Sequence, residues 1–346
     1  RTFKRYKWTS SNPEVATVDE KTGLVTGISK GDATIIVTAD DFSSNPVSAS
    51  CEIGVKIVTP ITGMTFTEDA ELNQLGYGQE YQVKYTLEPV DATASLLTWT
   101  SDNPEVISVD KTGKLKVHTT KAASAVITAS YGPVVQNVTV TVADGRFWYS
   151  LGNGLGNGLD NNWYLDGNNA SVVSSDGNKT TVQMGGPDSK VKYRGDLWLA
   201  RSGKGKVVNI TPAEYRYLAV KIGFKSQLHV GNNSQGCIKL EVFDDGIKKI
   251  GPEYWGTAGD ANNRYAILGT SEISITKPNV LYYDLQARYK TVTPTDWNQV
   301  FDLSQCKFVI ADFPETAQTY DLYWIRSFKS IEELQAFVDS ENNTNE

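Results

Sequence analysis

Cysteine and histidine are scarce in this chain. Its 346 residues include three cysteines, Cys51, Cys237 and Cys306, and two histidines. The cysteines lie far apart without Cys-x-x-Cys spacing, which argues against the common zinc and thioredoxin-like motifs. Each lies in or beside an apolar run, where a free cysteine behaves as a small buried apolar residue. A disulfide between Cys237 and Cys306 remains an alternative, because neighbouring strands of one domain can bring two cysteines together.

Clustered positive charge and long apolar runs are also missing. The formal net charge is -7, and binding of nucleic acid requires clustered Lys and Arg, so we expect no nucleic acid partner. No polybasic segment favours an anionic membrane surface. No apolar run reaches the roughly 18 residues that a transmembrane helix needs. The chain starts at Arg1 inside a recognisable module, so we expect any export signal and lipid anchor to lie outside this sequence.

Combinations of catalytic residues are equally hard to find. His118 and His229 lie in different modules, and no Gly-x-Ser-x-Gly turn accompanies them. A glycosidase needs two carboxyl groups roughly 5 to 9.5 Å apart. Glu241 and Asp245 share a strand face but would be about 13 Å apart. We therefore predict a protein that is not an enzyme. Carboxyl groups brought together from distant strands keep a polysaccharide hydrolase as the least favoured alternative.

What the chain does contain is an internal repeat with a period of about 90 residues, too long for a solenoid unit. The stretch Trp-Thr-Ser-Ser-Asn-Pro-Glu-Val that begins at Trp8 recurs with one substitution from Trp99. A Thr-Gly pair follows each copy, at Gly23 and at Gly113. Short β-forming runs separated by such turns, without helical periodicity, predict small β-sandwiches.

Both copies, WTSSNPEVATVDEKTGLVTGISKGDATIIVTA and WTSDNPEVISVDKTGKLKVHTTKAASAVITAS, resemble bacterial Ig-like modules of group 2. We assign residues 1–59 to a partial module and 60–143 to a complete one. The first copy lacks the strands that should precede its tryptophan, which predicts an open apolar face. The resemblance implies spacers or adhesion arms at a bacterial surface.

The composition changes after a short linker predicted at residues 143–145. Glycine, asparagine and aromatic residues become frequent, and six of the eight tryptophans lie in residues 144–346. Short strand-like runs separated by Gly, Asn, Asp and Pro turns predict a jelly-roll-type β-sandwich, with a terminal helix at 331–338 capped by Ser330. The fold class is therefore all-β: two Ig-like modules, the first incomplete, and a larger sandwich.

Two features of this last domain resemble known sugar-binding proteins. The closing segment TYDLYWIRSFKSIEELQAF is similar to the last strand of carbohydrate-binding jelly rolls. The order of modules resembles the surface glycan-binding lipoproteins of gut Bacteroidetes. That resemblance implies an outer-membrane protein that captures a polysaccharide, such as the hemicellulose xylan, beside a TonB-dependent importer.

A sugar site needs exposed aromatic planes for stacking and amide, carboxylate or guanidinium groups for the hydroxyls. A glycine-flanked stretch at 251–265 carries such groups. Two shorter stretches each carry a tryptophan among polar residues, where we expect it to be exposed. The candidate ligand-binding residues are Trp255, Tyr254, Asn262, Asn263, Arg264, Trp297, Tyr289 and Trp163. Trp198 and Trp324 fall in apolar runs and are assigned to the core, although Tyr323 or Trp324 could line a concave sheet face.

We expect no cofactor. Structural calcium, with oxygen ligands at Asp160 or at Asp244 and Asp245, stays open. The sequence thus predicts non-catalytic binding of a polysaccharide or oligosaccharide at the cell surface for capture and import. The alternative is a protein adhesin or a structural envelope protein, in which the same aromatic residues would be buried or would face another protein.

Overall fold

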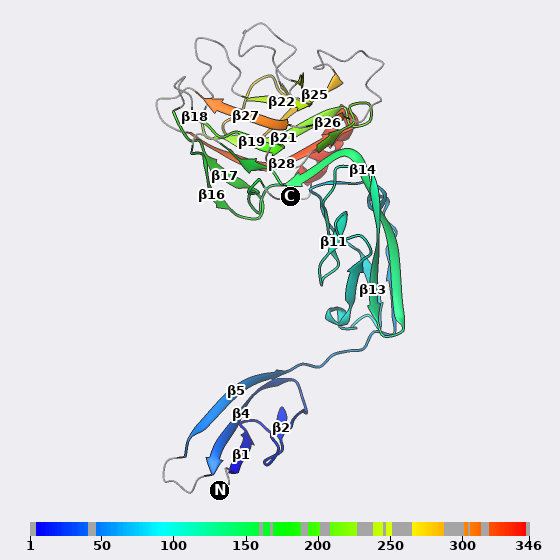
Figure 1. The fold of residues 1–346 in the computed structure, drawn as a ribbon, viewed down its shortest axis with the longest axis vertical. Coiled ribbons are helices and arrows are strands. Elements are labelled where there is room, and N and C mark those ends of the chain that lie inside the picture. The colour runs from blue at the N-terminus through cyan, green and yellow to red at the C-terminus, as the bar shows by residue number, and fades with distance from the viewer. Residues whose placement is uncertain are drawn as a thin grey trace. The chain divides into compact units, whose positions relative to one another are not determined.

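The computed structural model describes most of the chain: residues 5–40, 46–158, 162–166, 169–187, 193–200, 208–226, 238–244, 247–250, 265–286, 301–303, 305–312 and 318–343. Strands dominate, and one α-helix lies near the C-terminus of the described residues (Figure 1). The all-β prediction is confirmed. By contacts, the chain forms two compact units, one with residues 1–64 and 86–96 and one with residues 65–85 and 97–346.

The first Ig-like module has two small sheets. Its larger sheet has the order β1-β4-β5, with β1 (Arg5–Ser10), β4 (Gly31–Asp40) and β5 (Ser48–Val55); the smaller pairs β2 (Ala16–Val18) with β3 (Val25–Gly27). Its small buried core consists of Val15, Ala16 and Ala33. Trp8 packs on the Thr-Gly turn, where a Cβ on Gly23 would lie 2.7 Å from the indole.

The second Ig-like module contains the same strands and more. Its elements are β6 (Gly63–Phe66), η1 (Ala70–Asn73), β7 (Leu75–Tyr77), β8 (Glu80–Gln82), β9 (Tyr85–Glu88), η2 (Ala94–Leu96), β10 (Thr98–Ser101), β11 (Ile107–Val109), β12 (Lys114–Val117), β13 (Ala123–Tyr131) and β14 (Val134–Ser150). Trp99 again packs on a Thr-Gly turn, 2.6 Å from a Cβ built on Gly113. Both glycines have positive φ, which explains why the pair recurs.

Burial shows what the first module is missing. Trp99 is 9% exposed, and Phe66 stacks on it with ring centroids 5.7 Å apart. In the second module Leu115 pairs with Val109 and is fully buried, whereas its counterpart Val25, paired with Val18, is 40% exposed. Phe66, which covers Trp99, comes from the stretch before it. In the first module, the apolar side chains of Leu24, Val25 and Ile28 are exposed in the described residues.

The remaining strands form a sandwich of two sheets. One continues from β14 in the order β14-β28-β21-β25-β24, with β16 and β17 beside β28; the other has the order β15-β19-β27-β22-β23, with β18 beside β27. Their bounds are β15 (Tyr164–Leu165), β16 (Ser171–Ser175), β17 (Thr180–Gln183), β18 (Tyr193–Arg194), β19 (Leu197–Ala200), β21 (Tyr217–Phe224), β22 (Ile238–Asp244), β23 (Ile247–Ile250), β24 (Ala266–Ile267), β25 (Asn279–Asp284), β27 (Gln305–Asp312) and β28 (Thr319–Phe328). A separate pair joins β20 (Val208–Ile210) to β26 (Phe301–Leu303).

Large apolar side chains fill the space between the two sheets. Tyr149, Leu218, Leu240, Phe308 and other buried residues form one cluster. The C-terminal helix α1 (Ile331–Asn343) is longer than predicted, and the amide of Glu333 donates to the Ser330 hydroxyl at 3.2 Å, as a capping residue requires.

The predicted linker at 143–145 is wrong. Strand β14 runs through it as a single ribbon (Figure 1), pairs with β13 as far as Val142, and pairs with β28 from Trp148. Gly145, with φ of +67°, lies where the partner changes. A Cβ there would lie 2.4 Å from the Thr211 hydroxyl, so the glycine permits a close approach. One strand, β14, therefore belongs to both modules, with a change of partner between Val142 and Trp148.

Polar contacts reinforce this junction. Arg146, buried, donates to Glu71 at 2.8 Å and to the carbonyl of Gln74. On the other side, the Thr120 hydroxyl donates to the Asn209 side chain at 2.6 Å and accepts from the Asn209 amide at 3.2 Å. Both sets of contacts join the second Ig-like module to the sandwich; the Thr120–Asn209 contacts are buried and the Arg146–Glu71 contact is partly buried.

The cysteines divide between two environments. Cys306 is a free thiol with 1% exposure in the sandwich core, as the free-cysteine interpretation predicts. Cys237 lies outside the described residues. Cys51 is exposed on β5, and its assignment as a buried apolar residue is wrong. Because β5 belongs to the incomplete module, the core that would bury its side chains is small.

Candidate functional site

Most of the predicted sugar-binding residues lie outside the described residues. These are Tyr254, Trp255, Asn262, Asn263, Arg264, Tyr289 and Trp297. Trp163 is described, and its assignment as an exposed platform is wrong. The side chain is fully buried, with its ring centroid 5.2 Å from that of Phe308 and 6.1 Å from that of Tyr149. Polar neighbours in the sequence suggested a loop, but the side chain points between the sheets.

The two tryptophans assigned to the core differ. Trp324 is 3% exposed, as predicted. Trp198 is only partly buried and alternates with Leu197 and Leu199, which belong to the core cluster, so its indole lies on the outer face of the second sheet. The Lys307 ammonium lies 4.6 Å from its ring centroid, a cation–π distance.

Helix α1 covers one half of the outer face of the sheet that contains β28. Trp324, Phe328 and Ala219 project from the sheet into a cluster with Leu334 of the helix. The ring of Phe337 lies 5.5 Å from that of Trp324 and 5.4 Å from that of Trp148. This half of the face is buried.

The rest of the same face carries polar groups around one partly exposed aromatic ring. Tyr323 lies at the margin of the helix-covered cluster and is partly exposed. Its ring lies beside Gly223, where a Cβ would be 3.7 Å from Cε2, so no side chain of β21 covers it there. We call this surface the Tyr323 platform; it consists of Tyr323, Gly223, Asp321, Thr181, Lys179, Lys221 and Lys225.

Asp321 organises the polar part of the platform. Its Oδ2 accepts from Lys179 at 2.8 Å and from Lys225 at 2.9 Å, and its Oδ1 accepts from Thr181 at 2.7 Å. Burial alone would raise the pKa of Asp321, but these three hydrogen bonds outweigh it and lower the pKa to about 2. The carboxylate is therefore ionised at neutral pH and holds both ammonium groups in place.

The lysines differ in exposure. The side chain of Lys225 is 55% exposed, that of Lys179 is 29% exposed and that of Lys221 is 19% exposed. Lys221 pairs with Glu341 of α1 at 3.0 Å, and its Nζ lies 5.6 Å from the Tyr323 ring centroid. Bonding to Asp321 raises the pKa of Lys179, so this group remains charged at neutral pH. The platform thus combines an aromatic plane with charged donors.

Further polar side chains lie at the end of the platform where β28 begins. Gln183 donates to the carbonyl of Gln318 at 3.1 Å, and Ser226 donates to the Gln318 side chain. Hydroxyl and amide groups of this kind can both donate and accept hydrogen bonds.

Part of this arrangement can be found in the sequence. Lys221, Gly223 and Lys225 alternate with apolar residues in an otherwise apolar strand, as Asp321 alternates with Tyr320 and Leu322 in β28. That pattern places the polar groups on one face. Their convergence on Asp321 depends on the pairing of β17 and β21 with opposite edges of β28, which the sequence does not specify.

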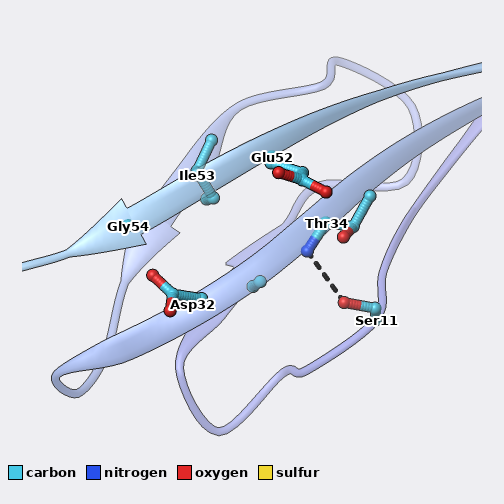
Figure 2. A pocket seen from close by; sticks show the side chains of 7 residues that line it. Ser11, Asp32, Thr34, Glu52, Ile53 and Gly54 are labelled. Carbon is cyan, nitrogen blue, oxygen red and sulfur yellow. Dashed lines mark hydrogen bonds between the residues drawn. The ribbon is translucent and has the colours of Figure 1, made fainter.

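A pocket in the first module is less suited to a sugar. It is lined by Ser11, Asp32, Ala33, Thr34, Glu52, Ile53 and Gly54 (Figure 2). Ser11 accepts a hydrogen bond from the Thr34 amide at 2.8 Å, and the carboxylates of Asp32 and Glu52 extend from β4 and β5. None of the described lining residues is aromatic, so no ring is available for stacking.

The described residues contain neither a group of metal-ligating side chains nor a membrane-spanning helix. No group of three or more His, Cys, Asp or Glu side chains in the described part of the chain is arranged to bind a metal. Asp160 and Asp245 lie outside the described residues. Within the described ranges, no helix has the length and apolar character needed to cross a membrane.

The fold defines a multi-module all-β protein, and sequence profiles identify the modules. The profile described as "Domain of unknown function (DUF4979)" matches residues 154–334, more than half of the chain, so the chain belongs to this family. The profile described as "Bacterial Ig-like domain (group 2)" matches residues 1–48 and 60–142. The N-terminal part therefore consists of bacterial Ig-like domains, as predicted.

Similarity to individual proteins is weaker. An uncharacterized protein of Clostridium acetobutylicum is 29% identical over 127 residues, which cover 37% of this chain and 12% of that protein. Domains 4–9 of the surface layer protein SbsC match at 15% identity and a TM-score of 0.21, over 92% of this chain and 38% of that one. A crystal structure with a xylogluco-oligosaccharide matches at 11% identity and a TM-score of 0.25, over 91% and 68%. Scores this low support no argument about function.

Proposed function

We propose that this protein binds a polysaccharide at the bacterial cell surface without cleaving it, and that the Tyr323 platform is a contact surface for the sugar. One observation carries the proposal: a partly exposed aromatic ring beside a glycine, surrounded by hydrogen-bonding side chains, on a sheet face whose other half is covered by α1. A sugar presents an apolar C–H face to such a ring and hydroxyl groups to its polar surroundings.

The proposal includes a cell location and partners. Group 2 Ig-like domains support a role outside the cytoplasm. The resemblance to surface glycan-binding lipoproteins adds an outer-membrane anchor outside this sequence and delivery of the glycan to a TonB-dependent importer. Xylan is the first polymer to test. In this proposal the Ig-like domains act as an arm, and the sandwich carries the sugar site.

Affinity gel electrophoresis and calorimetry against a panel of polysaccharides test the function. The protein should be retarded by at least one glycan and should release no reducing sugar from it. Failure on every glycan, with capture of a protein partner from envelope extracts, would favour the adhesin alternative. Release of reducing ends would show a hydrolase.

Substitution then tests the site. Loss of a stacked ring costs about 1 to 2 kcal/mol, so Tyr323→Ala should weaken binding roughly tenfold, while Tyr323→Phe keeps the ring and most of the affinity. Tyr6→Ala, which removes a tyrosine that is 51% exposed in the first module, is the control. Near-ultraviolet circular dichroism checks folding, because Tyr323 packs partly against the α1 cluster.

Trp255→Ala separates this surface from the site predicted by sequence. Residue 251 follows β23 of the second sheet, whereas Tyr323 lies on the first. If only Trp255→Ala weakens binding, the platform assignment is wrong and the sequence-based prediction holds. If only Tyr323→Ala does, the reverse is true.

A further inference from the structure

The charge around Tyr323 is unusual for this chain. The formal net charge of the protein is -7, yet three ammonium groups gather near one aromatic ring: those of Lys179 and Lys225 meet at Asp321, and that of Lys221 lies 5.6 Å from the Tyr323 centroid. A neutral sugar needs hydrogen bonds but no ammonium groups. The lysines therefore indicate a chemical feature of the ligand that the proposed function does not specify.

The carboxylates of Asp321, Glu341 and Asp176 match the three ammonium groups in number but leave some of their hydrogen-bond donors available. Lys179 and Lys225 both bond to a single oxygen of Asp321, while Lys221 is matched by Glu341. Asp176 lies nearby, but its Oδ1 accepts from the backbone amides of Asn178 and Lys179, at 2.9 and 2.8 Å, in its own turn. Of the two ammonium groups on Asp321, that of Lys225 belongs to the more exposed side chain and has donors left for a ligand.

On the basis of the proposed function, we infer that the glycan bound here carries carboxylate groups, that is, uronic acid residues. The sugar ring lies on Tyr323, and the uronate carboxylate accepts hydrogen bonds from Lys225 and Lys179, sharing these donors with Asp321. A lysine is a flexible point charge with three donors, which suits a carboxylate whose position along a polymer varies. Sparse uronates fit a chain of negative net charge better than a dense polyanion, which that charge would repel.

The experiment compares polymers that differ only in charge. Glucuronoxylan, polygalacturonate and alginate are each tested beside a carboxyl-reduced form of the same polymer, by calorimetry at 50 mM and 500 mM NaCl. Neutral xyloglucan and galactomannan complete the panel. We expect at least one native acidic polymer to bind several-fold more tightly than its reduced form. The difference should shrink at high salt, because salt screens interactions between exposed charges.

Variants locate the effect. Lys225→Met should abolish the preference for the acidic form, so that the native and reduced polymers bind with similar affinity. Lys329→Met is the matched control, because Lys329 is a lysine of the same sandwich, 46% exposed and paired with Glu214 at 2.9 Å. It should keep the full preference. Tyr323→Ala should weaken the binding of both forms.

The outcomes separate this inference from the proposed function. Equal affinity for native and reduced polymers, or binding of neutral polymers alone, overturns the uronate inference and leaves glycan binding intact. A preference for acid that Lys225→Met does not change overturns the role of the platform lysines. No binding to any glycan overturns both.

Discussion

The junction between the second Ig-like module and the sandwich gives the sharpest prediction about stability. Arg146 lies on β14 just after Gly145, with 5% of its side chain exposed. It donates to Glu71 and to the carbonyl of Gln74, and its guanidinium lies 4.4 Å from the centroid of Trp148. Arg146→Met keeps much of the length and apolar contact but removes the charge and both donors.

The cost follows from what the substitution leaves behind. Removal of one partner of a buried ion pair destabilises a protein by about 3 to 5 kcal/mol. Glu71 is 26% exposed and also accepts from Gln79 at 2.7 Å, so it keeps part of its solvation and one hydrogen bond. We therefore expect a cost just below this range, about 2 to 3 kcal/mol, a large share of the 5 to 15 kcal/mol typical of a folded domain.

Hydrogen exchange measured by mass spectrometry can test both the magnitude and the coupling. In the wild type, slowly exchanging amides of β14 before and after Gly145 should open with similar free energies, because one strand serves both modules. In Arg146→Met both sets should exchange roughly 30 to 150 times faster. Lys84→Met, which removes a surface pair to Asp69 with the lysine 62% exposed, should change exchange very little. Independent opening on the two sides in the wild type, or an unchanged rate in Arg146→Met, would refute this reasoning.

Two further predictions concern titration and thiol chemistry. Because the pKa of Asp321 is lowered, its contribution to stability, about 2 kcal/mol, is present above pH 4 and is lost as the pH falls toward 2. Urea unfolding from pH 5 to 2 should show this loss. Asp321→Asn should be less stable than the wild type at pH 5, and its stability should lack the part of the pH dependence that comes from Asp321. Burial raises the pKa of the Cys306 thiol to about 12, so in a Cys237→Ser background a thiol reagent should label the exposed Cys51 and leave Cys306 unmodified until the protein unfolds. Rapid labelling of Cys306 in the native state would contradict its placement in the core.

The sequence predicted the parts of the fold that depend on local patterns. The repeated Trp and Thr-Gly pair specify the Ig-like modules, because the indole packs on a glycine that needs positive φ. Short strand-like runs between Gly, Asn, Asp and Pro turns indicated strands of the larger sandwich such as β19 and β21. Ser330 marked the start of α1, but the end of the helix was missed because Ser340 and Asn342 are poor helix formers in isolation.

The features that sequence reasoning missed depend on partners distant in the chain. Asp144 and Gly145 are typical linker residues, yet here they lie within a strand held by β7, β13 and β28. Trp163 has polar neighbours, yet Phe308, far along the chain, buries it. The Tyr323 platform was only partly foreseen, since three separate strands bring its charged residues together. Most of the predicted sugar site lies in residues 251–264 and 287–300, and its role in binding stays a prediction.

The continuous strand β14 also limits how this protein can change in evolution. Among the described strands, those of the first module pair only with one another, so a copy of this module can be gained or lost without breaking a strand pairing of the sandwich. The second module is different: a replacement would have to supply an acid for Arg146, a hydroxyl for Asn209 and a strand in the place of β7 to pair with β14. Recombination should therefore exchange the second Ig-like module and the sandwich as one block.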